Sequence, residues 1–267
     1  MSVRVALFVT YRDDSNEGQT VTGRDLVKYR VPVLHDWETK GPRWCDMWLR
    51  AGTSDEQVLD EILVNDVYHL RGLEITRPSV EVPRPLVLDI GACTGIFAAM
   101  VARMLPDVRI VAVEPDRENV ELLTLNTAKW RDRIEIVPKA VGAHEGTTTL
   151  FGSHATGHTK HDAHSDDFGV PVEQITLASL LTEPVALLKV DCEGQEMAGL
   201  FDSCSEDQMC LVDRVVMETH GTREAPWIDD APRRYGELVT KLAFTHSVQA
   251  FGRPDEGGYL FAHSYRV

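Results

Sequence analysis

From residue 86 onward, short apolar runs alternate along the chain with segments in which apolar residues recur every three or four positions. A short apolar run predicts a buried strand, and the three-to-four periodicity predicts a helix that covers it. The expected strands are 86–90, 109–114, 134–137, 185–191 and 214–218, and the expected helices are 96–105 and 117–128. Because alternating strands and helices form parallel sheets with right-handed crossovers, the pattern predicts a doubly wound α/β sheet.

The last part of the chain changes to a paired pattern. Segments 244–251 and 258–264 flank the polar segment 252–257, which predicts an antiparallel hairpin at one edge of the sheet. Further upstream, 152–167 is polar and rich in histidine, so we expect a long solvated loop there, with a substrate lid or a metal cluster as alternatives. Its histidines are His154, His158, His161 and His164.

The first third of the chain is less regular. Its short apolar pieces lie at 3–10 and 29–34, and a helix is expected near 54–64. Ser54 or Thr53 is the expected N-cap of that helix. Three prolines between 78 and 85 then interrupt the chain. We therefore expect an N-terminal extension, residues 1–84, followed by a sheet domain, residues 85–267.

Composition and charge narrow the class of protein. The chain has 27 Lys and Arg against 42 Asp and Glu, a net charge of −15 that repels nucleic acid and anionic lipid. No apolar run approaches the roughly 18 residues of a membrane span, and no cleavage site follows the first apolar stretch. The five cysteines include no CxxC pair. We expect a cytoplasmic protein that acts on a small molecule, without a nucleic-acid or membrane partner.

A glycine-rich turn follows the first strand of the sheet. Glycine lets the backbone approach a ligand closely, and the helix after the turn presents free N–H groups. The candidate binding residues in this turn are Asp89, Gly91, Ala92, Cys93 and Gly95. In the dinucleotide fingerprint G-x-G-x-x-G, Cys93 and Ile96 occupy the second and third glycine positions. A dinucleotide is therefore disfavoured.

The next strand ends in a carboxylate. Glu114 is followed by Pro115 and Asp116, and it lies 23 residues beyond Gly91. An acidic residue at this strand end accepts both hydroxyl hydrogens of a ribose. Together the two motifs indicate a nucleoside at the carboxyl edge of the sheet, and S-adenosylmethionine (SAM) fits better than a dinucleotide. The alternative is that the glycines serve only helix–strand packing.

Two later strands carry further ionisable residues. Lys189 and Asp191 share a face because side chains alternate along a strand, and Glu218 and His220 do so in the next one. Neighbouring positions in the sheet would bring all four together beside the nucleoside. A lysine in an apolar strand needs a partner, so an ion pair that only orders the sheet is the alternative role for Lys189.

Several segments together resemble the FkbM-type SAM-dependent methyltransferases. The matching segments are RAGTSDEQVLDEIL, VYHLRG, VLDIGACTGIF, VAVEPDRENVELLTLN, KAVG, LLKVDCEGQE and METHG. The resemblance implies a class I, Rossmann-like methyltransferase fold with a seven-stranded sheet. It also implies methyl transfer to a hydroxyl of a sugar or secondary metabolite, in natural-product biosynthesis. It adds Ala140 and Tyr68 to the cofactor-binding candidates, beside Asp191.

The sequence departs from the family pattern in the glycine turn. Cys93 stands where the family commonly has asparagine. Upstream, Arg50 and Asp55 fall in the matching region with Tyr68 and are candidates to cover the SAM pocket or contact the acceptor. Trp44 and Trp48, four residues apart, are expected to pack in the core or in a homodimer.

Methyl transfer to a hydroxyl requires alignment of the reacting atoms and a base for the hydroxyl proton. We expect Asp191 nearest the methyl group and His220, oriented by Glu218, as the base, with the two roles interchangeable. Lys189 completes the catalytic set. In a less favoured version, Asp191, Glu218 and His220 hold a divalent metal ion that orients two acceptor hydroxyls.

Three other functions compete with O-methylation. An N-methyltransferase on the same fold usually has an Asn/Asp-Pro-Pro-aromatic motif where this chain has LKVDCEG. A nicotinamide-dependent oxidoreductase is disfavoured by the missing glycines. A non-catalytic methyltransferase-like binding module is disfavoured because Asp191, Glu218 and His220 are all present.

Overall fold

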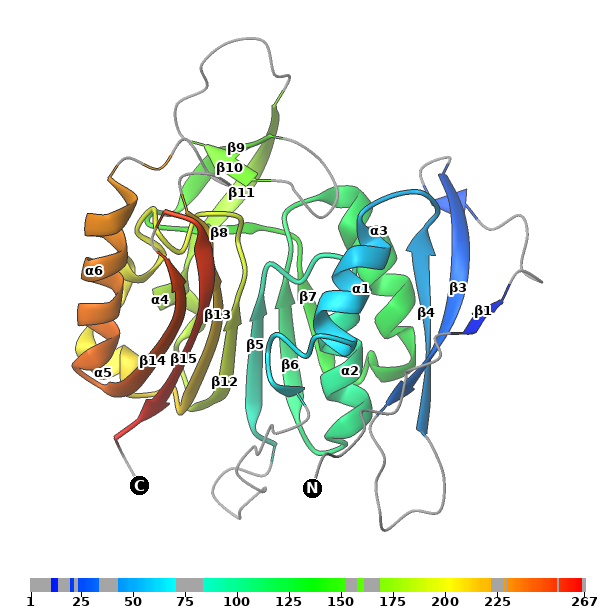
Figure 1. Cartoon of the computed structure of the whole chain (residues 1–267), viewed down its shortest axis with the longest axis horizontal. Helices are drawn as coiled ribbons and strands as arrows, with labels where there is room; N and C mark the ends of the chain where they lie inside the picture. Colours follow the sequence, from blue (N-terminus) through cyan, green and yellow to red (C-terminus); the bar gives the residue numbers. More distant parts are fainter. Residues whose placement is uncertain are drawn as a thin grey trace.

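A seven-stranded sheet in the order β14-β15-β13-β12-β5-β6-β7 forms the centre of the protein (Figure 1). Its strands are β5 (Leu86–Ile90), β6 (Arg109–Val113), β7 (Ile134–Val137), β12 (Val185–Val190), β13 (Arg214–Thr219), β14 (His246–Arg253) and β15 (Gly257–Ser264). Strands β7, β6, β5, β12 and β13 are parallel, whereas β15 runs antiparallel to β13 and to β14. The predicted doubly wound sheet with an antiparallel edge hairpin is confirmed.

The computed structural model describes most of the chain. The described residues are 11–13, 20–21, 24–33, 43–70, 84–151, 158–160, 169–221, 228, 230–253 and 255–265. Within them no helix combines the length and the apolar character that crossing a membrane requires.

The strand residues divide between two hydrophobic clusters. Leu86, Leu88 and Ile90 pack in one cluster, whereas Val87 packs in the other. This division follows from alternation of side chains along β5, and all five of its residues are buried. The sheet therefore has two covered faces, as a parallel sheet requires.

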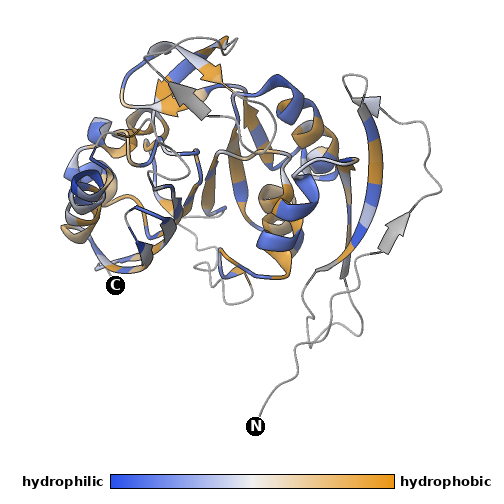
Figure 2. Cartoon of the chain, turned by 45° about the horizontal axis from the view of Figure 1, so that its top comes forward, coloured by the Kyte–Doolittle hydropathy of each residue, from blue (hydrophilic) through white to orange (hydrophobic). Residues whose placement is uncertain are grey.

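Helices cover both faces of the sheet (Figure 1). On one side lie α1 (Asp55–Leu63), α2 (Ile96–Met104) and α3 (Arg117–Thr127), with the 3₁₀ turn Ala128–Trp130. On the other lie α4 (Leu177–Leu180), α5 (Glu206–Met209) and α6 (Ala231–Ala243), with the 3₁₀ turn Leu200–Ser203. Hydrophobic residues concentrate on the strands and on the inner sides of the helices (Figure 2).

Local capping explains where two of these helices begin. Asp116 is the N-cap of α3, and its carboxylate accepts hydrogen bonds from Glu118 N at 2.8 Å and Asn119 N at 3.0 Å. Ser54 is the N-cap of α1, as predicted, but its own side chain makes no capping bond. Instead the Thr53 hydroxyl accepts from Asp55 N at 3.2 Å.

The N-terminal region adds a second sheet outside the helices. It contains β1 (Tyr11–Asp13), β2 (Thr20–Val21), β3 (Arg24–Val33) and β4 (Arg43–Arg50), all antiparallel. Val31, Met47 and Leu49 are fully buried in the cluster that also contains residues of α2. Trp44 is 42% exposed and Trp48 is half-buried. The predicted apolar piece 3–10 lies outside the described residues, and the division at residue 84 stays a prediction.

A third sheet replaces part of the predicted loop 152–167. It has the order β10-β9-β11-β8, formed by β8 (Ala140–Gly142), β9 (Gly146–Phe151), β10 (His158–Lys160) and β11 (Val170–Thr176). The loop prediction is wrong at His158–Lys160, which pairs antiparallel with Thr149–Phe151. The edge of β9, which is rich in β-branched threonines, pairs with this segment. The segment's own sequence has no strand pattern, so the pairing could not be predicted from it. The other three histidines lie outside the described residues.

Candidate functional site

A cavity opens at the carboxyl ends of β5, β6 and β12. Its wall includes six residues that the sequence predicted for cofactor binding: Gly91, Cys93, Glu114, Pro115, Ala140 and Asp191. The remaining wall residues are Ile90, Val113, Asn119, Lys139, Val141, Leu150, Cys192, Glu193 and Gln195. Carboxyl ends of parallel strands are the usual ligand-binding edge of such sheets.

The glycine turn brings β5 and β12 very close together. Gly91 has φ +74°, and a β-carbon on it would lie 1.7 Å from the carbonyl oxygen of Asp191. Gly95 has φ +81°, and a β-carbon there would lie 2.5 Å from Leu123 Cδ1. Cys93 between them also has a positive φ of 48°. The turn therefore requires glycine at two positions and strains the backbone at a third.

Glu114 is a buried carboxylate in the cavity wall. It accepts hydrogen bonds from Cys93 N at 2.8 Å, Asp116 N at 3.0 Å and Asn119 Nδ2 at 3.1 Å. Burial raises the pKa of Glu114 to about 7, although these three donors oppose the shift. The carboxylate is thus fixed in position at the strand end where a ribose would bind.

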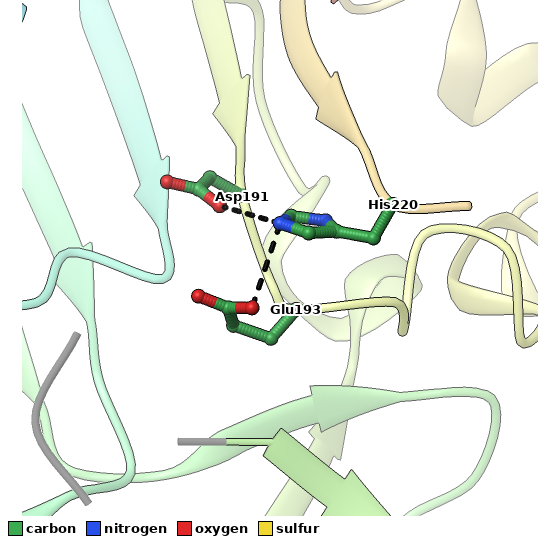
Figure 3. A group of neighbouring side chains, drawn as sticks. All are labelled: Asp191, Glu193 and His220. Carbon is green, nitrogen blue, oxygen red and sulfur yellow. Dashed lines mark ion pairs between the residues drawn. The ribbon is translucent and has the colours of Figure 1, made fainter. Parts of the chain in front are cut away.

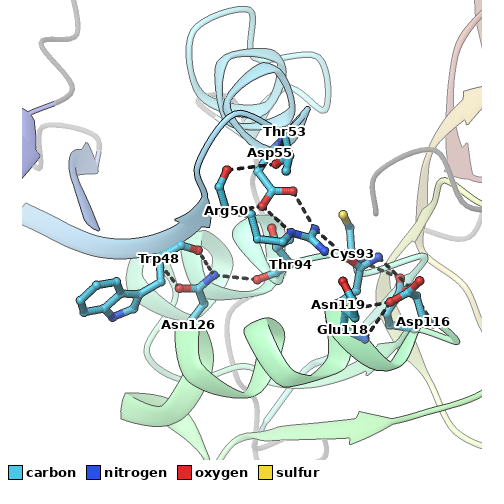
Figure 4. A network of polar contacts seen from close by, with 11 residues as sticks. Trp48, Arg50, Thr53, Asp55, Cys93, Thr94, Asp116, Glu118, Asn119 and Asn126 are labelled. Atoms are coloured by element: carbon cyan, nitrogen blue, oxygen red, sulfur yellow. Dashed lines mark hydrogen bonds and ion pairs between the residues drawn. The ribbon is translucent and has the colours of Figure 1, made fainter. Parts of the chain in front are cut away.

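A buried ion pair, Arg50–Asp55, connects the N-terminal region to Asn119 of α3 (Figure 4). Arg50, at the end of β4, donates to Asp55 Oδ1 and Oδ2 at 2.7 and 2.8 Å, and both side chains are fully buried. Arg50 Nη2 also donates to Asn119 Oδ1 at 2.8 Å. The side-chain nitrogen of the same asparagine, Nδ2, donates to Glu114 Oε1. Arg50 and Asp55 therefore position the cavity wall from behind.

Lys189 lies buried between two carboxylates. Its ammonium nitrogen is 3.3 Å from Asp89 Oδ1, 3.5 Å from Asp191 Oδ2 and 2.6 Å from the carbonyl oxygen of Gly91. Burial alone would lower the pKa of Lys189, but Asp89 and Asp191 raise it above its ordinary value. Lys189 therefore stays charged and binds the strand ends together.

Tyr68 joins the carboxylates of two strands. Its hydroxyl lies 2.8 Å from Asp191 Oδ2 and 3.2 Å from Glu218 Oε2. Burial and the neighbouring Asp191 raise the pKa of Glu218 to about 8. Burial would also raise the pKa of Asp191, but Lys189 and His220 hold it below its ordinary value. At neutral pH Asp191 is a carboxylate and Glu218 is mainly protonated.

His220 is oriented by Glu196 and not by Glu218. Its Nδ1 lies 2.7 Å from Glu196 Oε1, which also accepts from His220 N at 2.8 Å. The predicted orientation by Glu218 is wrong because β13 ends at Thr219, so alternation along the strand does not extend to His220. Burial alone would lower the pKa of His220, but the carboxylates of Glu196, Asp191 and Glu193 outweigh burial, so the net pKa lies well above its ordinary value.

The other ring nitrogen of His220 faces two carboxylates (Figure 3). Its Nε2 lies 3.9 Å from Asp191 Oδ1 and 3.5 Å from Glu193 Oε2. Among the described residues, Asp191, Glu193 and His220 form a group of metal-ligand type with all ligand atoms within 4.8 Å of one another. Glu218, which the sequence placed in the metal set, is not in this group.

A family model establishes what kind of protein this is. The model of the methyltransferase FkbM domain matches residues 89–251, more than half of the chain. The chain belongs to the FkbM methyltransferase family. The resemblance of the glycine turn, of the acidic strand end and of the LLKVDCEGQE segment to this family is confirmed, and its seven-stranded sheet is the class I methyltransferase arrangement.

Two curated relatives match parts of this FkbM protein. The AMB antimetabolite synthetase AmbE of Pseudomonas aeruginosa is 27% identical over 154 residues, which is 54% of this chain and 7% of the synthetase. The release factor glutamine methyltransferase of Rhodopirellula baltica is 28% identical over 133 residues, 48% of this chain and 41% of the relative. The chain thus spans less than half the length of either relative.

Methyltransferases also occur among the solved structures similar to this FkbM protein. The precorrin-6y C5,15-methyltransferase of Geobacter metallireducens matches with a TM-score of 0.43 and 12% identity, covering 80% of this chain and 98% of that one.

Five predicted cofactor residues lie outside the cavity wall of the FkbM domain. Asp89 faces Lys189, and Asp116 caps α3. Tyr68 bonds Asp191 and Glu218. Ala92 and Gly95 belong to the turn itself and pack behind the wall. These residues shape the site, whereas Glu114 and Cys93 border the cavity directly.

Two carboxylates of the FkbM site, Glu193 and Glu196, are not among the residues predicted from the sequence. Glu193 and Glu196 follow β12 in the segment LLKVDCEGQE, after Asp191. Three acidic residues within six positions directly after a buried strand were the available signal. A turn has no side-chain period, so their directions become visible only in the structure.

Proposed function

We propose that this FkbM protein is a SAM-dependent O-methyltransferase whose acceptor is a hydroxyl of a sugar or a secondary metabolite. The observation that carries the proposal is the position of Asp191, which borders the cavity next to Glu193 and lies 3.9 Å from His220. One edge of the cavity therefore has a buried acid suited to a ribose, and the other has two carboxylates beside an imidazole.

The residues of the cavity suit SAM. Glu114 offers carboxylate oxygens at the strand end where ribose hydroxyls bind in this fold. Val113, Pro115, Val141 and Leu150 supply an apolar wall for an adenine ring. Bound SAM supplies a methyl group on a positively charged sulfur, which is already activated for transfer.

The protein's own contribution is alignment and removal of a proton. Asp191 is ionised at neutral pH, whereas carboxylates hold His220 in its charged form. We therefore assign Asp191 as the base that accepts the acceptor hydroxyl's proton, the exchanged version of the roles expected from the sequence. A positioned base contributes roughly 10²–10⁴-fold to the rate. Lys189 and Tyr68 fix Asp191 Oδ2, which leaves Oδ1 on the side of His220.

A metabolite acceptor is supported by the relative AmbE, an antimetabolite synthetase. A nitrogen acceptor is the second candidate, since the other relative is a release factor glutamine methyltransferase. The segment LKVDCEG stands where N-methyltransferases usually have Asn/Asp-Pro-Pro-aromatic, and this favours oxygen. A screen of hydroxyl and amide acceptors, read as S-adenosylhomocysteine release, distinguishes the two.

Calorimetry with SAM, S-adenosylhomocysteine and NADH tests the cofactor. We expect both SAM and S-adenosylhomocysteine to bind, and Glu114→Gln to weaken them by about 10–100-fold because hydrogen bonds to a charged group are lost. Glu135→Gln is the matched control, since Glu135 is exposed on the neighbouring strand β7. Binding of NADH in place of SAM, or no binding of SAM, would overturn the proposal. SAM binding that Glu114→Gln leaves unchanged would overturn the assignment of Glu114 to the ribose.

A further inference from the structure

Asp191, Glu193 and His220 present three ligand atoms to one point at the rim of the cavity (Figure 3). His220 Nε2 is 3.9 Å from Asp191 Oδ1 and 3.5 Å from Glu193 Oε2. On an octahedral ion with bonds of about 2.1 Å, ligand atoms lie about 3.0 Å apart when adjacent and about 4.2 Å apart when opposite. The two His220 separations lie between these values, and all three ligand atoms lie within 4.8 Å of one another, so a small side-chain adjustment would bring them onto one ion.

A fourth residue fixes the direction of the imidazole. Glu196 is fully buried, and its Oε1 lies 2.7 Å from His220 Nδ1. Its Oε2 accepts from Gly194 N at 3.1 Å, so the carboxylate is itself held in place. A carboxylate on one ring nitrogen leaves the other nitrogen as the ligand atom, which is the usual arrangement around metal-binding histidines. This observation is independent of the clustering of Asp191 and Glu193.

The two oxygens of Asp191 have separate environments. Oδ2 accepts a hydrogen bond from the Tyr68 hydroxyl at 2.8 Å and lies 3.5 Å from the Lys189 ammonium nitrogen. Oδ1 faces His220. The lysine therefore neutralises one side of the carboxylate while the other side stays directed at the group formed with Glu193. Glu218 lies on the Tyr68 side, which explains its absence from the ligand group.

We propose that Asp191, Glu193 and His220 bind one divalent cation of the Mg²⁺ or Mn²⁺ type, with Glu196 as the positioning residue. Once the ion has displaced the proton that His220 otherwise holds, two carboxylates and an imidazole carry a charge of −2, which a divalent ion balances. Oxygen-rich ligand sets suit these ions. Three protein ligands leave three positions of an octahedral ion for other groups. Two neighbouring hydroxyls of an acceptor can occupy two of them, so the favoured acceptor is a vicinal diol.

The role of the ion in catalysis rests on the proposed function, whereas ion binding itself does not. A bound cation would polarise the acceptor oxygen and favour loss of its proton to a base. The new bond joins that oxygen to the methyl carbon as the bond from carbon to sulfur breaks, and S-adenosylhomocysteine leaves. With the ion bound, Asp191 would hold it through Oδ1 and would accept the hydroxyl proton through Oδ2, the oxygen that Tyr68 and Lys189 contact.

Titration of the full-length protein with Mn²⁺, followed by electron paramagnetic resonance, tests the site without SAM or acceptor. We expect one Mn²⁺ per chain, a loss of affinity of at least tenfold in Glu193→Gln, and a 10–100-fold loss in Glu196→Gln. Glu135→Gln should bind Mn²⁺ like the wild type, because it removes the same charge from an exposed position on β7. Circular dichroism confirms that each variant is folded, and Glu193 is partly exposed, so its amide is tolerated.

Two outcomes would overturn the inference: no Mn²⁺ binding by the wild type, or equal binding by wild type and Glu193→Gln. SAM calorimetry in the presence of a chelator separates this result from the proposed function. SAM binding without Mn²⁺ binding overturns the metal site alone. Mn²⁺ binding that Glu193→Gln weakens, without SAM binding, supports the metal site and overturns the methyltransferase function.

Discussion

A β-carbon on Gly91 would lie 1.7 Å from the carbonyl oxygen of Asp191. Gly91 follows β5, Asp191 follows β12, and the two strands pair in parallel up to Ile90 and Val190. The close approach places the turn that borders the cofactor cavity directly against the segment that carries the candidate base. One glycine thus couples the two halves of the site.

Replacing Gly91 with alanine should therefore damage both stability and binding. Positive φ and the clash together predict a loss of about 2–5 kcal/mol in the free energy of unfolding. Gly52→Ala is the matched control, since Gly52 has φ +70° but nothing within 4 Å of an added β-carbon. It should lose only about 1–2 kcal/mol. Urea denaturation measures both, and equal losses in the two variants would contradict the steric explanation.

Cys93 should be replaceable with a gain in stability. It has φ +48°, a region that asparagine enters far more readily than cysteine. We expect Cys93→Asn to raise the free energy of unfolding by about 1 kcal/mol. Cys93→Ala removes the thiol but keeps the strained backbone, so it should give no gain. If alanine stabilised as much as asparagine, the thiol and not the backbone would be the source of the strain.

The buried Arg50–Asp55 pair should be essential to the fold of the FkbM domain. Arg50→Met leaves Asp55 buried without its charge partner, which costs about 3–5 kcal/mol. Arg30→Met breaks the ion pair with Asp46, in which Arg30 is 56% exposed, and should cost less than about 1 kcal/mol. Chemical denaturation of both variants provides the comparison. Similar losses would show that burial does not determine the contribution of these pairs.

Glu114 should make stability depend on pH. Its pKa is about 7 in the folded protein because of burial, against 4.5 ordinarily. The folded state therefore favours the protonated form, and this stabilisation is complete below about pH 4.5 and lost as the pH rises through 7. Glu114→Gln should thus be more stable than the wild type at pH 8, by about 3 kcal/mol. The difference should shrink toward pH 5 in urea denaturation, and a difference independent of pH would contradict the assignment.

The sequence predicted the elements of the central sheet because their burial leaves a strong local pattern. The run from Leu86 to Ile90 is apolar at four of five positions and bounded by Pro85 and Gly91, and the strand has those bounds. The polar segment around His158 has no such pattern, since its strand is specified by pairing with Thr149–Phe151. Tertiary pairing can thus create a strand where local preference is weak.

In the candidate site, too, the contacts that depend on tertiary structure could not be predicted from the sequence. Alternation along β12 predicted that Lys189 and Asp191 share a face, and the order of the strands predicted Glu218 beside them. Lys189 does contact Asp191, and Glu218 contacts Tyr68 next to it. His220 lies one residue beyond the end of β13, and its partner Glu196 lies in a turn. No periodicity relates a strand end to a turn elsewhere in the sequence, so this pairing could not be predicted.

Asp191→Asn and Tyr68→Phe should lower turnover to different extents, and both variants should still bind SAM. Asp191→Asn removes the assigned base, so kcat should fall about 10²–10⁴-fold with an acceptor identified by the screen. Tyr68→Phe removes only the hydroxyl that fixes Asp191 Oδ2 at 2.8 Å, so a smaller loss is expected. The dependence of kcat on pH separates the two roles. Tyr68→Phe retains the base, so its kcat should still fall at low pH as Asp191 becomes protonated, whereas Asp191→Asn should lose that fall. Turnover unchanged in Asp191→Asn would show that the hydroxyl proton leaves by another route and that this carboxylate only orders the strand ends.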